Sequence, residues 1–135
     1  TGVRRSASKV LKTQNENMSK PGKREITKKL VDYAIEVNER LQVGDLSKIG
    51  EYMDVSWELK MQLADSISNI QFNQLYAQAK NCGALGGKLL GAGGGGFFLF
   101  IVDPTERNSF LTRFTDLEFI DFKMTKIGVE TIYNG

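Results

Sequence analysis

The chain has 135 residues, of which 41% are hydrophobic and 25% are charged, the ordinary mixture of one globular domain. The net charge of +2 is too balanced to indicate a nucleic-acid or membrane partner. One cysteine, Cys82, and no histidine exclude an internal disulfide and effectively exclude a zinc site and a Ser-His-Asp triad.

Apolar residues at three- and four-residue steps predict five helices, at about residues 3–13, 24–43, 45–64, 69–82 and 104–116. Residues suited to helix starts precede three of them: Asp45, Ser68 with Gln71 as a capping box, and Asp103 with Pro104. Gly44 and Gly83 are suited to ending the second and the fourth helix.

The periodicity changes after Gly83. We expect strands at about 86–90, 96–102, 118–124 and 128–133, and the nearly continuous apolar run of the second predicts a central position. Helices first and strands later indicate an α+β domain over residues 1–135, with the helices on one face of a mainly antiparallel sheet.

The segment GALGGKLLGAGGGGFFLFIV, residues 83–102, holds most of the chemical information. It formally contains GxGxxG, but a dinucleotide-binding loop needs a strand before it and a helix after it, whereas here a strand follows. A Walker A loop also fails, since Cys82 stands where its first glycine should be and no Ser or Thr follows Lys88.

Two readings of the glycines remain. A glycine-rich hairpin would let two strands turn or a helix pack closely, but a tight turn needs only one or two residues with positive φ. A nest, in which successive unshielded N–H groups converge on an anion, would use the whole run Gly91, Ala92, Gly93, Gly94, Gly95 and Gly96. RNA binding is a weaker alternative, because the aromatic residues are consecutive and the basic surface is small.

The segment closely resembles the third motif of the GHMP kinases, the galactokinase, homoserine, mevalonate and phosphomevalonate kinase superfamily. TGVRRSAS at the start resembles the segment that opens the C-terminal domain, with Arg5 at its arginine position. SWELKMQL together with the glycine run is most similar to the branch acting on D-glycero-D-manno-heptose 7-phosphate, with fucose kinases nearby.

This resemblance implies a ferredoxin-like C-terminal domain of an ATP-dependent sugar-phosphate kinase. In the family, a separate N-terminal domain carries the main phosphate loop and often a catalytic aspartate, and neither Pro21 nor Pro104 starts such a loop here. ATP and Mg²⁺ would therefore be bound mainly by that domain. No catalytic or metal-binding residue is expected in this chain, which alone should be inactive.

The resemblance places Gly91 to Gly96 at the phosphoryl-transfer site. Lys88 could favour a substrate phosphate or be an exposed lysine, and Arg5 could contact sugar or phosphate or form a structural salt bridge. Asp54 and Glu58 lie four residues apart, which is more typical of a solvated helix face than of a carboxylate pair. Trp57 is expected in the core, although it could instead be an aromatic residue beside a sugar. Cys82 is expected as a small buried residue.

The first residue is Thr1, which suggests a piece of a longer protein cut at a domain boundary, or else removal of a leader. The single cysteine fits a reducing cytoplasm, and no apolar run is long enough to span a bilayer. The expected partners are the N-terminal kinase domain and a small sugar or sugar-phosphate substrate. The alternative is a non-catalytic α+β module that binds an anion or mediates assembly.

Overall fold

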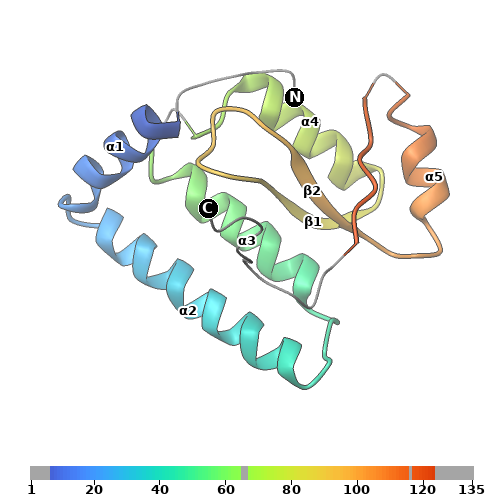
Figure 1. Cartoon of the computed structure of the whole chain (residues 1–135), viewed down its shortest axis with the longest axis horizontal. Helices are drawn as coiled ribbons and strands as arrows, with labels where there is room; N and C mark the ends of the chain where they lie inside the picture. Colours follow the sequence, from blue (N-terminus) through green and yellow to red (C-terminus); the bar gives the residue numbers. More distant parts are fainter. Residues whose placement is uncertain (1–6, 65–66, 116, 124–135) are drawn as a thin grey trace, which may run out of the picture.

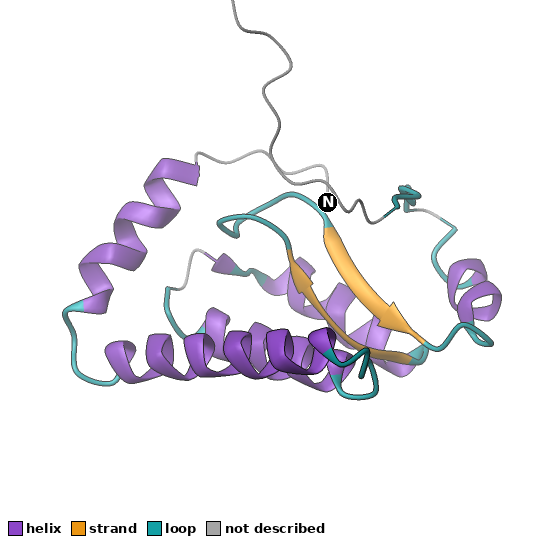
Figure 2. Cartoon of the chain, turned by 60° about the horizontal axis from the view of Figure 1, so that its bottom comes forward, coloured by secondary structure: helices purple, strands orange, loops and turns teal. Residues whose placement is uncertain are grey.

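The structure is a computed structural model that describes residues 7–64, 67–115 and 117–123. Within these ranges it contains helices followed by a β-hairpin and one short helix (Figure 1). The elements are α1 (Ala7–Met18), α2 (Lys23–Gln42), α3 (Ile49–Met61), α4 (Ile70–Asn81), β1 (Ala84–Leu89), β2 (Phe98–Val102) and α5 (Arg107–Thr112). The α+β class is therefore confirmed. Figure 2 shows α2, α3 and α4 beneath the two strands, with α1 and α5 to either side.

The two strands form an antiparallel pair in which Leu89 lies opposite Phe98 and Lys88 lies opposite Leu99. Both strands were expected, within two residues at each end. The strand expected at 118–124 is wrong for residues 117–123, which have no strand conformation, and the strand expected at 128–133 lies outside the described residues. Among the described residues β2 pairs only with β1, so its expected central position is not observed there.

Helix boundaries differ from the expected ones where side chains bond to nearby backbone instead of capping. Asp45 accepts from the backbone N–H of Ser47 at 3.0 Å, so α3 begins only at Ile49. Asp103 likewise accepts from the N–H of Thr105 at 2.8 Å, and α5 is shorter than expected. Such local turns compete with helix formation.

Asn69 replaces the expected capping box of Ser68 and Gln71. The Asn69 side chain accepts from the backbone N–H of Phe72 at 2.9 Å, which satisfies one of the free donors at the start of α4. At the start of the chain, α1 extends to Met18, beyond the expected end at residue 13.

Glycines end α2 and α4, as expected. Gly44 has φ 73° and donates to the carbonyl of Leu41, while the N–H of Asp45 reaches back to the carbonyl of Arg40. This pair of bonds is the Schellman arrangement, which needs a left-handed residue after the helix. Gly83, with φ 102°, follows α4 in the same way.

The core lies between α3, α4 and the hairpin. Its main cluster consists of Val10, Trp57, Ala64, Ile67, Phe72, Tyr76 and Leu89. A second cluster, Ala79, Ala84, Phe110 and Phe114, joins α5 to the strands. Trp57 is 1% exposed and meets Phe98 edge-on at 5.5 Å, so its expected place in the core is confirmed.

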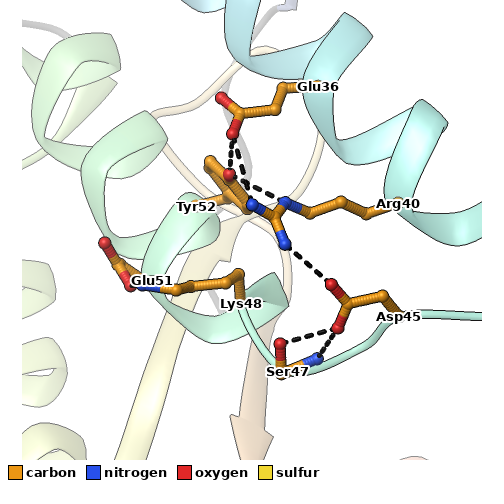
Figure 3. A network of polar contacts seen from close by, with 7 residues as sticks. All are labelled: Glu36, Arg40, Asp45, Ser47, Lys48, Glu51 and Tyr52. Atoms are coloured by element: carbon orange, nitrogen blue, oxygen red, sulfur yellow. Dashed lines mark hydrogen bonds and ion pairs between the residues drawn. The ribbon is translucent and has the colours of Figure 1, made fainter.

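α2 was expected from apolar residues at helical spacing, yet none of its residues is buried. Polar contacts centred on Arg40 connect it to α3 (Figure 3). The Arg40 guanidinium donates to the Tyr52 hydroxyl at 3.0 Å and to Asp45 at 2.7 Å, and the Tyr52 hydroxyl donates to Glu36. The hydrogen bond to Glu36 and burial raise the pKa of Tyr52.

Candidate functional site

The glycine run forms the loop between β1 and β2. The N–H of Leu90 donates to the carbonyl of Phe97 at 2.8 Å, and this bond closes the loop at its base. Beyond it, Gly91 to Gly96 extend past the paired strands on the side of the molecule where α1 lies (Figure 1, Figure 2). A hairpin, one of the two alternatives for the glycines, is thus present, with a loop longer than a tight turn requires.

Left-handed backbone explains why glycines occupy this loop. Gly91, Gly93, Gly94 and Gly96 have φ values of 78°, 99°, 75° and 115°. Residues with a Cβ rarely adopt this conformation, which costs them roughly 1–2 kcal/mol each. Four such positions in one loop exceed the need of a simple hairpin, so the loop has a specific shape that side chains would disfavour.

Two hydrogen bonds anchor the loop to the helical layer. The N–H of Gly94 donates to the carbonyl of Ile67 at 2.9 Å, and the Lys60 ammonium donates to the carbonyl of Gly91 at 2.6 Å. Ile67 is fully buried. A Cβ on Gly93 would lie 3.0 Å from the Ile67 Cα, so the loop also packs tightly at this point.

The backbone N–H groups of the loop differ in their hydrogen bonds and in their exposure to solvent. Within the described ranges, no hydrogen bond engages the N–H of Ala92, Gly93 or Gly95. Gly93 is buried, whereas Ala92 and Gly95 are half-buried. The Gly94 N–H is turned inward to Ile67, so in this conformation it is not a donor for a ligand. The loop therefore keeps some of the free amides that a nest requires, and uses one to hold its own shape.

Lys88 lies on β1, just before the loop, and is half-buried. No ion pair connects it to any other described residue. Arg5 lies outside the described residues.

Lys60 is a residue of this site that sequence reasoning missed. It follows Trp57 by one helical turn on α3 and is half-buried. Burial lowers the pKa of Lys60, and the nearby positive charge of Lys88 lowers it further. No carboxylate within the described ranges forms an ion pair with it, so the two lysines make the neighbourhood of the loop electropositive. The only sequence signal is a lysine beside the apolar stripe of α3.

A polar cluster of Asp54, Tyr76 and Lys80 contacts the backbone of β1. Asp54 accepts from the Tyr76 hydroxyl at 2.5 Å and from the Lys80 ammonium at 2.8 Å. With its proton directed to Asp54, the Tyr76 hydroxyl accepts from the N–H of Gly87 at 3.2 Å. Burial raises the pKa of Tyr76 the most, and the hydrogen bond to Asp54 raises it further.

The expectation of a solvated Asp54–Glu58 face is therefore wrong for Asp54, although Glu58 is exposed. Asp54 ties α3 to α4 and, through Tyr76, to β1. Cys82 is half-buried rather than buried, and it packs against the Phe110 and Phe114 cluster.

Among the described residues, the side chains around the loop are not suited to holding Mg²⁺. In the described part of the chain, no group of three or more Cys, Asp or Glu residues could bind a metal ion. Mg²⁺ prefers carboxylate, water and phosphate oxygens, while the cations beside the loop are lysines. Free amides and ammonium groups instead suit phosphate oxygens.

Residues 29–117, which include the loop, match the family described as GHMP kinases C terminal. A D-glycero-alpha-D-manno-heptose 7-phosphate kinase of Campylobacter jejuni is 33% identical over 100 residues, covering 73% of this chain and 30% of that protein. The L. major mevalonate kinase in complex with R-mevalonate superposes with a TM-score of 0.68 at 26% identity, over 82% of this chain and 34% of that one.

The chain thus spans about a third of the length of these two kinases. None of the helices described here combines the length and the apolar character needed to cross a membrane.

Proposed function

Because this chain belongs to the GHMP kinase C-terminal family, we propose that it is the C-terminal part of an ATP-dependent kinase that phosphorylates a small molecule. A sugar phosphate similar to heptose 7-phosphate is the substrate class that best fits, since a relative bears that name. The residues proposed to line the phosphoryl-transfer site are Gly91, Ala92, Gly93, Gly94, Gly95, Gly96 and Lys88, with Arg5 as a further candidate.

The observation that carries this proposal is the loop itself. It combines half-buried amides at Ala92 and Gly95 with the ammonium group of Lys88, and none of these groups has a partner among the described residues. Catalysis of phosphoryl transfer depends mainly on positioning and on stabilising the charge of the transferred group. Preorganised N–H donors stabilise such charge because they need no rearrangement during the reaction.

A second domain of the same polypeptide would complete the site. ATP and Mg²⁺ would bind mainly there. Two apolar side chains at the base of the loop, Leu90 and Phe97, are 41% and 55% exposed. Exposed apolar groups beside a binding loop are typical of a surface that another domain covers.

Steady-state assays test the proposal. This chain alone and the full-length protein would each be incubated with ATP, Mg²⁺ and a panel of acceptors: heptose 7-phosphate, fucose and mevalonate. We expect turnover by the full-length protein with a phosphorylated sugar and none by the chain alone. Turnover by the chain alone would contradict the shared site. Phosphate binding without turnover by the full-length protein would favour the non-catalytic anion-binding module instead.

A further inference from the structure

The contact between Lys60 and Gly91 determines the direction of one amide in the loop. The Lys60 ammonium donates to the carbonyl of Gly91 at 2.6 Å. No described residue has a cis peptide bond. In a trans peptide the C=O and the following N–H point in opposite directions, because the unit is planar. The N–H of Ala92 therefore points away from Lys60 and from α3.

Lys60 and Ile67 hold two successive parts of the loop in opposite ways. Ile67 accepts the N–H of Gly94 and so turns that amide inward. Lys60 binds a carbonyl and so turns the next amide, that of Ala92, outward. The Ala92 side chain packs against the main core cluster, which further limits rotation of this residue.

We propose that Lys60 is a positioning residue of this site: through the Gly91 carbonyl it orients and polarises the Ala92 N–H, which donates to a phosphate oxygen of the ligand. A cation on the carbonyl withdraws electron density from the amide, and chains of hydrogen bonds strengthen one another in this way. The identity of the phosphate as part of a kinase substrate or nucleotide rests on the proposed function. The direction of the Ala92 N–H rests only on the contact between Lys60 and Gly91.

The location of Lys60 favours this role over that of a solvated lysine. Its side chain is half-buried, and burial of an ammonium group is unfavourable unless hydrogen bonds compensate. Lys88 lies near enough to lower the pKa of Lys60. An anion bound over the loop would relieve the repulsion between these two cations, which adds to its affinity.

Nuclear magnetic resonance of the ¹⁵N-labelled full-length protein tests the direction of the amide. Inorganic phosphate serves as the probe. In the wild type we expect the Ala92 amide to exchange with solvent without phosphate, and to become protected and shift downfield at saturation. An Ala92 amide already protected without phosphate would overturn the proposal, and this measurement needs no variant.

Three substitutions separate orientation from charge. Lys60→Met removes the donor with similar packing, and we expect loss of the Ala92 shift at saturating phosphate. Lys60→Arg keeps a cationic donor and should restore the shift. Lys88→Met should weaken phosphate binding while leaving the shift at saturation unchanged. Lys28→Met, at an exposed position of α2, is the control. An unchanged Ala92 shift in Lys60→Met would overturn the proposal.

Kinetics of the same variants distinguish this inference from the proposed function. If the wild type is a kinase, Lys60→Met should lower kcat by roughly a hundredfold, the lower end of the range for losing one preorganised donor. Lys60→Arg should recover most of that loss. An active wild type with unchanged kcat in Lys60→Met would refute the role of Lys60 and leave the kinase proposal intact. An inactive wild type with the expected Ala92 shift would refute the kinase proposal alone.

Discussion

Gly86 of β1 and Gly50 of α3 are in direct backbone contact. A Cβ on Gly86 would overlap the carbonyl oxygen of Gly50 and lie 2.7 Å from its carbonyl carbon. Both residues are buried. The absence of two side chains therefore lets α3 lie against β1, and α3 also carries Lys60 and Asp54, the residues that reach the loop and Tyr76. The close approach is a condition for the geometry of the whole site.

Gly86→Ala should strongly destabilise the protein. The new methyl group meets backbone, which cannot move as a flexible side chain can, so we expect a loss at or above the upper end of the overpacking range, about 3 kcal/mol. Urea unfolding gives the free energy. Gly22→Ala is the control: a Cβ there meets nothing within 4 Å, but its φ of 82° costs an alanine roughly 1–2 kcal/mol. A loss in Gly86→Ala no larger than in Gly22→Ala would contradict a close contact between α3 and β1.

Tyr76→Phe should destabilise the protein by about 1–3 kcal/mol, the usual cost of leaving buried polar groups without partners. The variant removes the acceptor for the N–H of Gly87 and one donor to Asp54, while the ring can still pack. Tyr33→Phe is the matched control, since the structure shows no hydrogen bond from the Tyr33 hydroxyl to another described residue. A loss as small as that of Tyr33→Phe would contradict a structural role for the cluster.

The contribution of Tyr76 to stability should depend on pH. Its pKa is raised above the ordinary value of 10.0 in the folded protein, so the native state keeps the phenol proton that the unfolded chain loses. The stabilisation is thus fully present below pH 10 and decreases as pH rises above it, by up to about 1.4 kcal/mol per pH unit. Urea unfolding from pH 7 to 11 should show a steeper decline for the wild type than for Tyr76→Phe. Parallel declines would contradict the raised pKa.

Gly91→Ala and Gly93→Ala form a pair that separates backbone strain from lack of space. Both positions have positive φ, which costs a residue with a Cβ roughly 1–2 kcal/mol. Only at Gly93 would the Cβ press on Ile67, at 3.0 Å, whereas at Gly91 nothing lies within 4 Å. We expect Gly93→Ala to lower the free energy of unfolding more than Gly91→Ala. The reverse order would mean that the loop is not packed against Ile67.

Features that depend on near neighbours in the chain could be read from the sequence. The spacing of apolar residues predicted the helices, and Gly44 and Gly83 marked the ends of two of them. The change of periodicity around the glycine run predicted the two strands that flank it. The same holds for the left-handed conformations in the loop, since glycine alone adopts them at little cost. Boundaries at Asp45 and Asp103 were wrong because each side chain bonds to a backbone amide two residues on, which competes with capping.

Contacts between distant segments were decided only by the tertiary structure. A helical pattern tells which face of α3 is apolar, but it does not tell which element packs there or how closely. Lys60 and Gly91 lie 31 residues apart, and Asp54 and Tyr76 lie 22 apart, so no local periodicity connects them. The sequence by itself determined two strands joined by a run of glycines. The packing of α3 against β1 decided that a half-buried lysine, Lys60, would bind the Gly91 carbonyl of that loop and turn one of its amides outward.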